Sequence, residues 1–161
     1  MNKTEKFEET VVFIADKLNG LQYAFRGTTS LVLQGIDMNV DDIDILTDKK
    51  TALAANEILK EYLVEKVEYK ESDKFKSYFG KFRVNTNLVE VYGEWQIKES
   101  QKWSEIYYSS DDEITKITMG NREIRATSVE TELSMFAKMG RWNAYHKLRK
   151  QVEMRKQMPL L

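Results

Sequence analysis

The 161-residue sequence contains no cysteine, which excludes disulfides, thiolate metal sites and a cysteine nucleophile. Its one proline is Pro159, so no proline-rich linker divides the chain. Its one histidine, His146, cannot by itself form a histidine-rich metal site. The sequence shows neither a signal peptide nor an apolar run of about 18 residues. We therefore expect a single cytoplasmic domain over residues 1–161, with no membrane segment.

Neither sign of charge is in clear excess, since 25 basic and 26 acidic residues give a net charge of -1. Such a chain lacks the positive field that gathers nucleic acid over a whole surface. Hydrophobic residues make up 42% of the sequence and charged residues 32%, which is typical of a globular rather than a disordered protein. The composition thus predicts one soluble domain with its own hydrophobic core.

Hydrophobic periodicity predicts helices and strands that alternate at first and are grouped later. Apolar residues at helical spacing predict helices, and alternating segments rich in β-branched and aromatic residues predict strands. The expected helices cover residues 7–18, 27–35, 52–62, 127–140 and 142–152, and the expected strands cover 21–25, 41–46, 64–69, 74–84, 88–95, 113–119 and 122–126. This order predicts an α+β domain with a small mixed sheet flanked by helices.

Capping signals predict where two of these helices begin. Either Thr47 or Asp48 is placed to cap the helix near residue 52. Further along, Thr127-Ser-Val-Glu130 fits a capping box, in which the hydroxyl of Thr127 and the carboxylate of Glu130 satisfy each other's free backbone donors. Gly140 is expected to end the helix that follows.

Two aspartates, Asp42 and Asp44, stand one residue apart in the expected strand 41–46. Side chains at this spacing leave the same face of a strand, whereas Ile43 and Ile45 leave the opposite face. Neighbouring carboxylates repel each other unless a cation joins them. Magnesium prefers such oxygen ligands and keeps positions for substrate phosphates. The pair therefore predicts a magnesium site that also takes a phosphate-bearing substrate.

A phosphate-binding turn is expected upstream, where Gly27-Thr-Thr-Ser30 lies between a strand and a helix. The first turn of a helix has free backbone N–H groups that attract phosphate. Gly27 lets the backbone approach a ligand closely, and Thr28 and Ser30 can add hydroxyl contacts. A phosphate site near paired carboxylates is what phosphoryl transfer from a nucleoside triphosphate requires.

These residues resemble the signature of the nucleotidyltransferase superfamily, in which a hydrophobic residue, a glycine and a small residue precede Asp-hydrophobic-Asp-hydrophobic. Thirteen residues separate Thr28 from Asp42, which is within the usual range of that family. Residues 77–80, 89–93 and 139–141 also resemble segments of short bacterial and archaeal nucleotidyltransferase-like proteins. The resemblance covers roughly residues 20 to 150 and implies the DNA polymerase beta-like fold. Two residues depart from the pattern. Many relatives have a smaller residue at the position of Thr28 and an apolar residue at the position of Arg26.

The resemblance also implies a third carboxylate, on a later strand and flanked by hydrophobic residues. Glu90 matches this position within Leu88-Val-Glu-Val-Tyr92. Glu94 is the rival acid, because its even spacing from Glu90 could place it on the same strand face. Gly93 is expected to disrupt the strand before Glu94, which favours Glu90.

The activity implied by the resemblance is metal-dependent transfer of a nucleoside monophosphate, with ATP as the expected donor, to a hydroxyl acceptor of unknown identity. Asp42, Asp44 and Glu90 would be the catalytic residues and would hold two Mg²⁺ ions. Five further residues would bind the nucleotide: Gly27, Thr28, Ser30, Lys138 and Arg141. Lys138 and Arg141 would do so by neutralising the charge of the triphosphate.

Other conspicuous residues have simpler interpretations. His146 is expected on the surface or half-buried on the last helix, without a catalytic role. The basic face of that helix is expected to be solvated rather than bound to nucleic acid; it contains Lys147, Arg149, Lys150, Arg155 and Lys156. Four aromatic residues could line an acceptor pocket, although packing in a core or interface is the simpler interpretation; they are Trp95, Trp103, Tyr107 and Tyr108.

The alternative function is a non-catalytic nucleotide-binding or partner-binding module, such as a toxin–antitoxin component. An intact set of three acids argues against it, because a binding module does not need costly neighbouring carboxylates. A nuclease or phosphatase usually gathers additional acids and histidines, which are missing. The acceptor would be a small molecule, a protein or an RNA end. Its site would come from residues 95–161, a second subunit of a homodimer or a partner protein.

Overall fold

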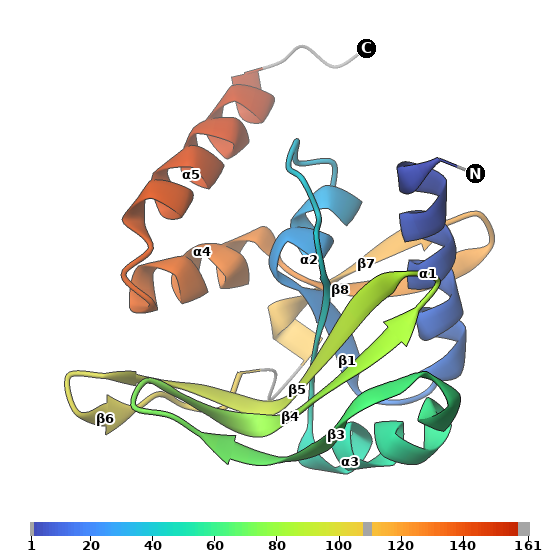
Figure 1. Cartoon of the computed structure of the whole chain (residues 1–161). Coiled ribbons are helices and arrows are strands. Elements are labelled where there is room, and N and C mark those ends of the chain that lie inside the picture. Colours follow the sequence, from blue (N-terminus) through green and yellow to red (C-terminus); the bar gives the residue numbers. More distant parts are fainter. Residues whose placement is uncertain (1, 108–110, 158–161) are drawn as a thin grey trace.

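The computed structural model describes residues 2–107 and 111–157 (Figure 1). The helices are α1 (Lys3–Lys17), α2 (Gly27–Leu33), α3 (Lys49–Ile58), α4 (Val129–Lys138) and α5 (Trp142–Gln157), with 3-10 helices at Lys60–Tyr62 and Asp111–Glu113. The strands are β1 (Tyr23–Arg26), β2 (Ile43–Thr47), β3 (Leu63–Glu71), β4 (Phe75–Val84), β5 (Asn87–Glu99), β6 (Lys102–Trp103), β7 (Ile114–Met119) and β8 (Arg122–Thr127). The order of elements is the one that the sequence predicts, apart from β6 and the two 3-10 helices, which were not expected.

Within the described residues, eight strands form a sheet in the order β3-β4-β5-β2-β1-β8-β7, with β6 paired to β5. The β2–β5 and β1–β8 pairs are parallel, and the other pairs are antiparallel. The sheet is mixed, as predicted, but larger than the small sheet expected, because the β7–β8 hairpin joins it through β1. The fold class is therefore α+β, with helices flanking a mixed sheet.

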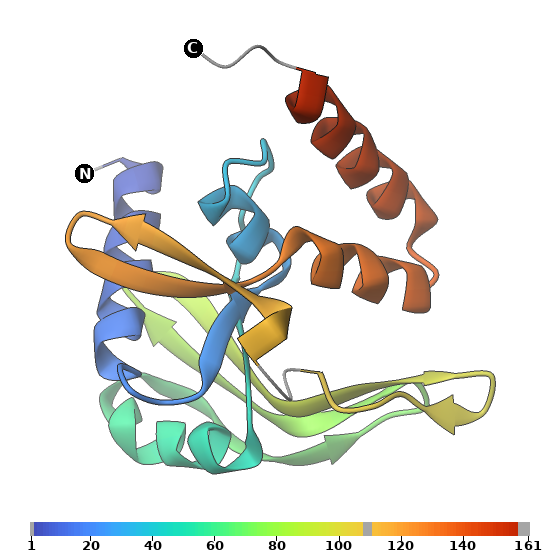
Figure 2. The same cartoon turned by 180° about the vertical axis from the view of Figure 1, so that it is seen from behind.

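Helices cover both faces of this sheet (Figures 1 and 2). On one face, α1 and α3 contribute Val11 and Ala55 to the main core, which also contains Ile45 of β2. On the other face, Met135 of α4 packs in a second core cluster with Leu46 of β2. Alternate residues of β2 thus belong to different layers, and Asp44 shares its face with Leu46.

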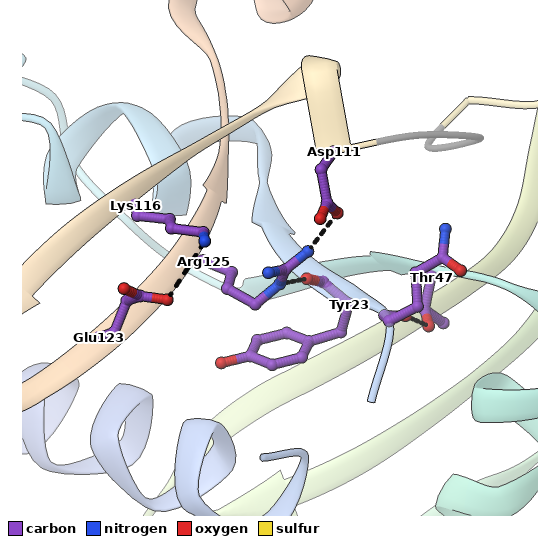
Figure 3. Close-up of polar contacts among 7 residues, drawn as sticks. Tyr23, Thr47, Asp111, Lys116, Glu123 and Arg125 are labelled. Atoms are coloured by element: carbon purple, nitrogen blue, oxygen red, sulfur yellow. Dashed lines mark hydrogen bonds and ion pairs between the residues drawn. The ribbon is translucent and has the colours of Figure 1, made fainter. Parts of the chain in front are cut away.

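Polar contacts fasten the ends of β1 and β2 that lie away from Asp44 (Figure 3). Arg125 of β8 donates from Nε to the Tyr23 carbonyl at 3.0 Å and from Nη2 to Asp111 at 2.7 Å. The Thr47 hydroxyl donates to the Gln22 carbonyl. Because Tyr23 pairs with Thr47 in the β1–β2 ladder, these bonds fix the register that places Asp44 at the other end.

A bulge changes which side chains of β5 face α4. Glu94 has a φ of +52°, and the β4–β5 register shifts beside Gly93. An extra residue in a strand reverses the side-chain alternation beyond it. Tyr92 and Trp95 therefore face the same side although they are three residues apart, and both rings contact the guanidinium of Arg26. The strand is disrupted beside Gly93, as expected, but only by this bulge, and β5 continues to Glu99.

The start of α4 differs from the predicted capping box. Ser128, not Thr127, is the N-cap, and its side chain accepts a hydrogen bond from the Thr131 N–H. The Thr127 hydroxyl instead donates to the buried Glu132 carboxylate at 2.6 Å. Thr127 is the last residue of β8, so its side chain is used to join the sheet to α4 and is not free to cap the helix. The prediction that Glu130 completes the box is therefore wrong.

The other predicted helix boundaries are close to those observed. Asp48, one of the two expected caps, accepts from the Thr51 N–H at the start of α3. The helix α4 ends before Gly140, whose φ is +71°. In α5, Leu148 is the one buried residue of the helix, and the predicted basic face is exposed, as is His146. No helix in residues 2–107 and 111–157 is long and apolar enough to cross a membrane.

Candidate nucleotide and acceptor site

Three neighbouring strands place charged side chains side by side on one face of the sheet. Arg26 at the end of β1 pairs with Asp44 of β2, and Asp44 pairs in turn with Glu90 of β5. The observed strand begins two residues later than predicted: β2 starts at Ile43, and Asp42 lies in the bend before it. Asp42 therefore reaches the site from the residue before the strand, and its carboxyl lies close enough to Glu90 and Asp44 to raise the pKa of both.

Thr29 in the first turn of α2 holds this bend in place. Its hydroxyl donates to the Asp42 carbonyl at 3.2 Å and accepts from the Asp44 N–H at 3.4 Å. Gly27, the first residue of α2, has a φ of +64°, and a Cβ added there would lie 3.2 Å from Asp44 Oδ2. The start of α2 therefore lies close to the carboxylate of Asp44.

Asp44 is the most perturbed acid of the site. Burial raises the pKa of Asp44 to about 7; the Arg26 charge opposes this shift, and Glu90, Asp42 and Glu132 add to it. Its Oδ1 is buried and has no hydrogen-bond partner among the described residues. An unpaired buried oxygen costs free energy unless a ligand satisfies it. Asp44 is therefore poised to bind a cation or a proton.

Glu90 lies close to the other two acids. Burial raises the pKa of Glu90; a hydrogen bond from Tyr92 lowers it, and the adjacent carboxyl of Asp42 raises it. The Tyr92 hydroxyl donates to Glu90 Oε2 at 3.1 Å. Burial also raises the pKa of Tyr92, so this phenol keeps its proton and remains a donor. The three predicted acids thus influence one another, although they come from a bend and two strands.

The site has oxygen donors suited to a metal ion, but they are not arranged as a complete set of metal ligands. In the part of the chain that the structure describes, no three His, Cys, Asp or Glu side chains are placed so that they could together hold a metal. The oxygen donors and the unpaired Asp44 Oδ1 fit a hard cation such as magnesium. The residues present therefore fit the ion, with Asp44 as its anchor.

The residue that sequence reasoning missed is Arg26. Its side chain is only 7% exposed, and its guanidinium carbon lies 3.8 Å from the centre of the Trp95 ring and 4.7 Å from that of Tyr92. Nη2 donates to the Met135 sulfur at 3.6 Å, whereas Nη1 is buried with no partner among the described residues. The available signal was a charged residue at the end of an apolar strand, directly before Gly27.

A cavity of about 520 Å³ opens beside these groups. Its walls come from the start of α2, from β2, from the β4–β5 hairpin and from α4 and the start of α5. Lys74 joins the two sides, because its Nζ donates to the Met139 carbonyl at 2.8 Å. Aromatic rings form much of the surface; Phe75, for example, stacks on Trp95 with ring centres 5.8 Å apart. A cavity of this size suits a small organic ligand.

The predicted nucleotide-binding residues lie in different places. Gly27, Thr28 and Arg141 line the cavity. Ser30 is fully buried, and its hydroxyl donates to the Gly27 carbonyl at 3.0 Å, so it holds the first turn of α2. Lys138 is exposed, with its Nζ 5.3 Å from the centre of the Tyr107 ring, and is not among the residues that line the cavity.

Glu94, the rival acid, lies away from the site, and the four candidate aromatic residues lie in different places. Glu94 accepts from the Lys49 N–H at 3.2 Å, at the start of α3, and so lies away from Glu90. Trp95 lines the cavity, and Tyr107 packs against it in the second core cluster. Trp103 lies under Lys76 and Lys98, outside the cavity wall. Tyr108 lies outside the described residues.

Comparison with known proteins identifies the class to which this fold and site belong. No protein-family model and no curated sequence matches the chain. A solved structure of a Thermotoga maritima protein assigned to the nucleotidyltransferases is similar, with a TM-score of 0.80 and 25% identity over 96% of each chain. The chain therefore has the fold of the nucleotidyltransferases, and this likeness is consistent with membership of that superfamily and supports a nucleotidyltransferase enzyme.

Two antibiotic-modifying proteins share the fold at lower identity. ANT(2")-Ia, solved with adenylyl-2"-tobramycin, has a TM-score of 0.56 and 16% identity, over 96% of this chain and 92% of its own. The lincosamide antibiotic adenylyltransferase LnuA, bound to lincomycin, has a TM-score of 0.51 and 17% identity, over 83% of this chain and 85% of its own. Identities this low support the fold and leave the substrates open.

Proposed function

We propose that this chain is a cytoplasmic enzyme that transfers a nucleoside monophosphate from a nucleoside triphosphate, with ATP as the expected donor, to a hydroxyl acceptor. The observation that carries the proposal is the closeness of Gly27 and Asp44 in the cavity wall, where a Cβ added to Gly27 would lie 3.2 Å from Asp44 Oδ2. It joins a helix start suited to phosphate with a carboxylate that has an unpaired oxygen.

Each acid has a role in this proposal. Asp42, Asp44 and Glu90 would hold two magnesium ions, which would neutralise phosphate charge and polarise the reacting phosphoryl group. Binding would require the side chains of Asp42 and Glu90 to turn toward Asp44. Glu90, held by Tyr92, would accept the proton of the acceptor hydroxyl. The acceptor oxygen then bonds to the α-phosphorus, and pyrophosphate leaves.

The nucleotide would lie against the start of α2. Backbone N–H groups at Gly27 and Thr28 would bind phosphate oxygens, and Arg141 would add positive charge from the far wall of the cavity. Ser30 would act indirectly by holding the first turn, and Lys138 would contribute only long-range charge. A homodimer is not required for this cavity, because one chain supplies all of the walls named above.

The test is calorimetric titration of magnesium with a non-hydrolysable ATP analogue. We expect metal-dependent binding to the wild type and its loss in the double variant Asp42→Asn/Asp44→Asn. Asp41→Asn is the matched control, because Asp41 is an exposed neighbouring acid and its change should leave binding intact. If ATP, GTP, CTP and UTP analogues all fail to bind the wild type, the transfer function is overturned and a partner-binding module becomes the better explanation.

A further inference from the structure

The cavity contains a buried positive charge that the proposed phosphate site does not use. Arg26 has no ion pair with any carboxylate among the described residues, and its Nη1 has no hydrogen-bond partner there. Asp44 interacts with this charge, since Arg26 opposes the rise in the pKa of Asp44, but the two groups form no direct ion pair. A buried charge without a directly bonded partner is costly, and proteins retain one mainly where something binds it. The two aromatic rings that enclose the guanidinium compensate only part of this cost.

The acids that line the cavity are already engaged. Glu132 accepts the hydroxyl of Thr127, and Glu71 accepts the hydroxyl of Tyr69 at 2.6 Å. Asp44 is the proposed metal anchor. Four cationic side chains line the cavity against three acidic ones. Lys70 is paired with Glu65 and Arg141 is assigned to the nucleotide, which leaves Arg26 and Lys76 for a second ligand.

The remaining walls suit a flat or apolar molecule. Phe75, stacked on Trp95, forms one side, and Phe136 of α4 lies on another, with the Arg141 guanidinium 5.4 Å from the centre of its ring. Aromatic walls with one deep charged group typically bind a ring that bears a complementary group. A nucleobase alone would leave the charge of Arg26 uncompensated, because it carries no charge at neutral pH.

We propose that this cavity holds the acceptor, and that the acceptor is a small aromatic molecule with a hydroxyl group and an anionic group that binds Arg26. The assignment rests on the proposed nucleotidyl transfer, since the cavity reaches Gly27, Thr28 and Asp44, where the α-phosphorus would lie. A polycation is a poor acceptor here, because it would meet the buried guanidinium and the basic walls.

The test compares three phenols whose para substituents are anionic, neutral and cationic: 4-hydroxybenzoate, 4-hydroxybenzamide and 4-hydroxybenzylamine. Titrations without nucleotide or metal should show the benzoate binding at least about tenfold more tightly than the amide, with the amine weakest. Arg26→Gln should remove this preference. Arg83→Gln is the matched control, because Arg83 is exposed on β4 and bonds only the Thr86 carbonyl.

A second pair of variants tests benzoate binding in the cavity if Arg26→Gln fails to fold. Ala144→Trp should block the cavity and abolish benzoate binding, whereas Asn143→Trp, at the exposed neighbouring position, should not. Equal binding of all three probes to the wild type would overturn the proposal, as would an unchanged benzoate preference in Arg26→Gln. A benzoate preference without any nucleotide binding would instead overturn the proposed transfer and leave the anion site standing.

Discussion

Gly27 is the residue at which backbone conformation and site chemistry meet. We expect Gly27→Ala to destabilise the protein by about 1–2 kcal/mol, because a side chain is strained at a φ of +64°. The added methyl group would also crowd Asp44 Oδ2, so the affinity for the metal-bound ATP analogue should fall. Urea unfolding and calorimetric titration measure the two effects.

Gly120→Ala separates these contributions. Gly120 has the same φ of +64°, but an added Cβ would meet nothing within 4 Å. It should therefore show the backbone cost alone, with unchanged nucleotide affinity. If both variants lose nucleotide affinity equally, contact with Asp44 is not the cause.

The raised pKa of Asp44 predicts how the stability of the metal-free protein depends on pH. The folded chain holds the Asp44 proton to about pH 7, whereas the ordinary value is 3.8. Stability from this group is fully present below about pH 4 and is lost as pH rises through 7. Asp44→Asn cannot lose a proton, so we expect it to be more stable than wild type by about 1–4 kcal/mol at pH 8.

Urea unfolding in the presence of a chelator, at pH 4.5, 6 and 8, measures this difference. The gain in Asp44→Asn should shrink steadily toward the lowest pH. Asp41→Asn provides the control, since Asp41 is exposed and should show no comparable trend. A gain that is the same at all three pH values would show that burial of the Asp44 charge is not its source.

Sequence pattern predicted the acids better than it predicted Arg26, for a physical reason. Asp44 and Glu90 lie in regular strands between hydrophobic residues, so alternation alone fixes their face. The environment of Arg26 depends on Trp95, which joins that face only because of the bulge at Glu94. A single bulge residue in a strand distant in sequence cannot be inferred from local periodicity.

At the level of elements, the start of α4 shows how tertiary contacts can override a local signal. We expect Ser128→Ala to destabilise the protein by about 1 kcal/mol, since it removes the acceptor for the Thr131 N–H. Thermal or urea unfolding measures the change. Glu130→Gln is the control and should have little effect on stability, because the capping box predicted for this residue does not form.

The opposite result, a large loss for Glu130→Gln and none for Ser128→Ala, would restore the sequence interpretation. The two possible caps are adjacent, and both carry a hydroxyl, so propensity could not choose between them. The choice depends on Glu132, which takes the Thr127 hydroxyl from a position inside the packed layer. Element boundaries are decided by such contacts, whereas the existence of the helix follows from its apolar stripe.

At the level of the whole molecule, the arrangement of layers separates structural from functional roles. The main core under α1 and α3 is built from apolar side chains, whereas the charged residues of the site lie on the face covered by α4. Short sequence segments around Gly27, Asp44 and Glu90 were enough to predict this fold. The cavity was not predictable, because its walls come from eight helices and strands that meet only in the folded chain.

This separation predicts where ligand binding slows hydrogen exchange. The ATP analogue with its metal would be added at about a hundred times its dissociation constant. Under this condition, the backbone amides of α2 and of the start of β2 that exchange within minutes should exchange about tenfold more slowly. Amides of α1 and α3 that exchange on the same timescale should not change, since those helices cover the other face. Mass spectrometry of short exchange times measures both groups, with Asp42→Asn/Asp44→Asn as the non-binding control. Equal slowing of α1 and α3 would mean that the ligand acts on the stability of the whole chain and not on local openings of the site.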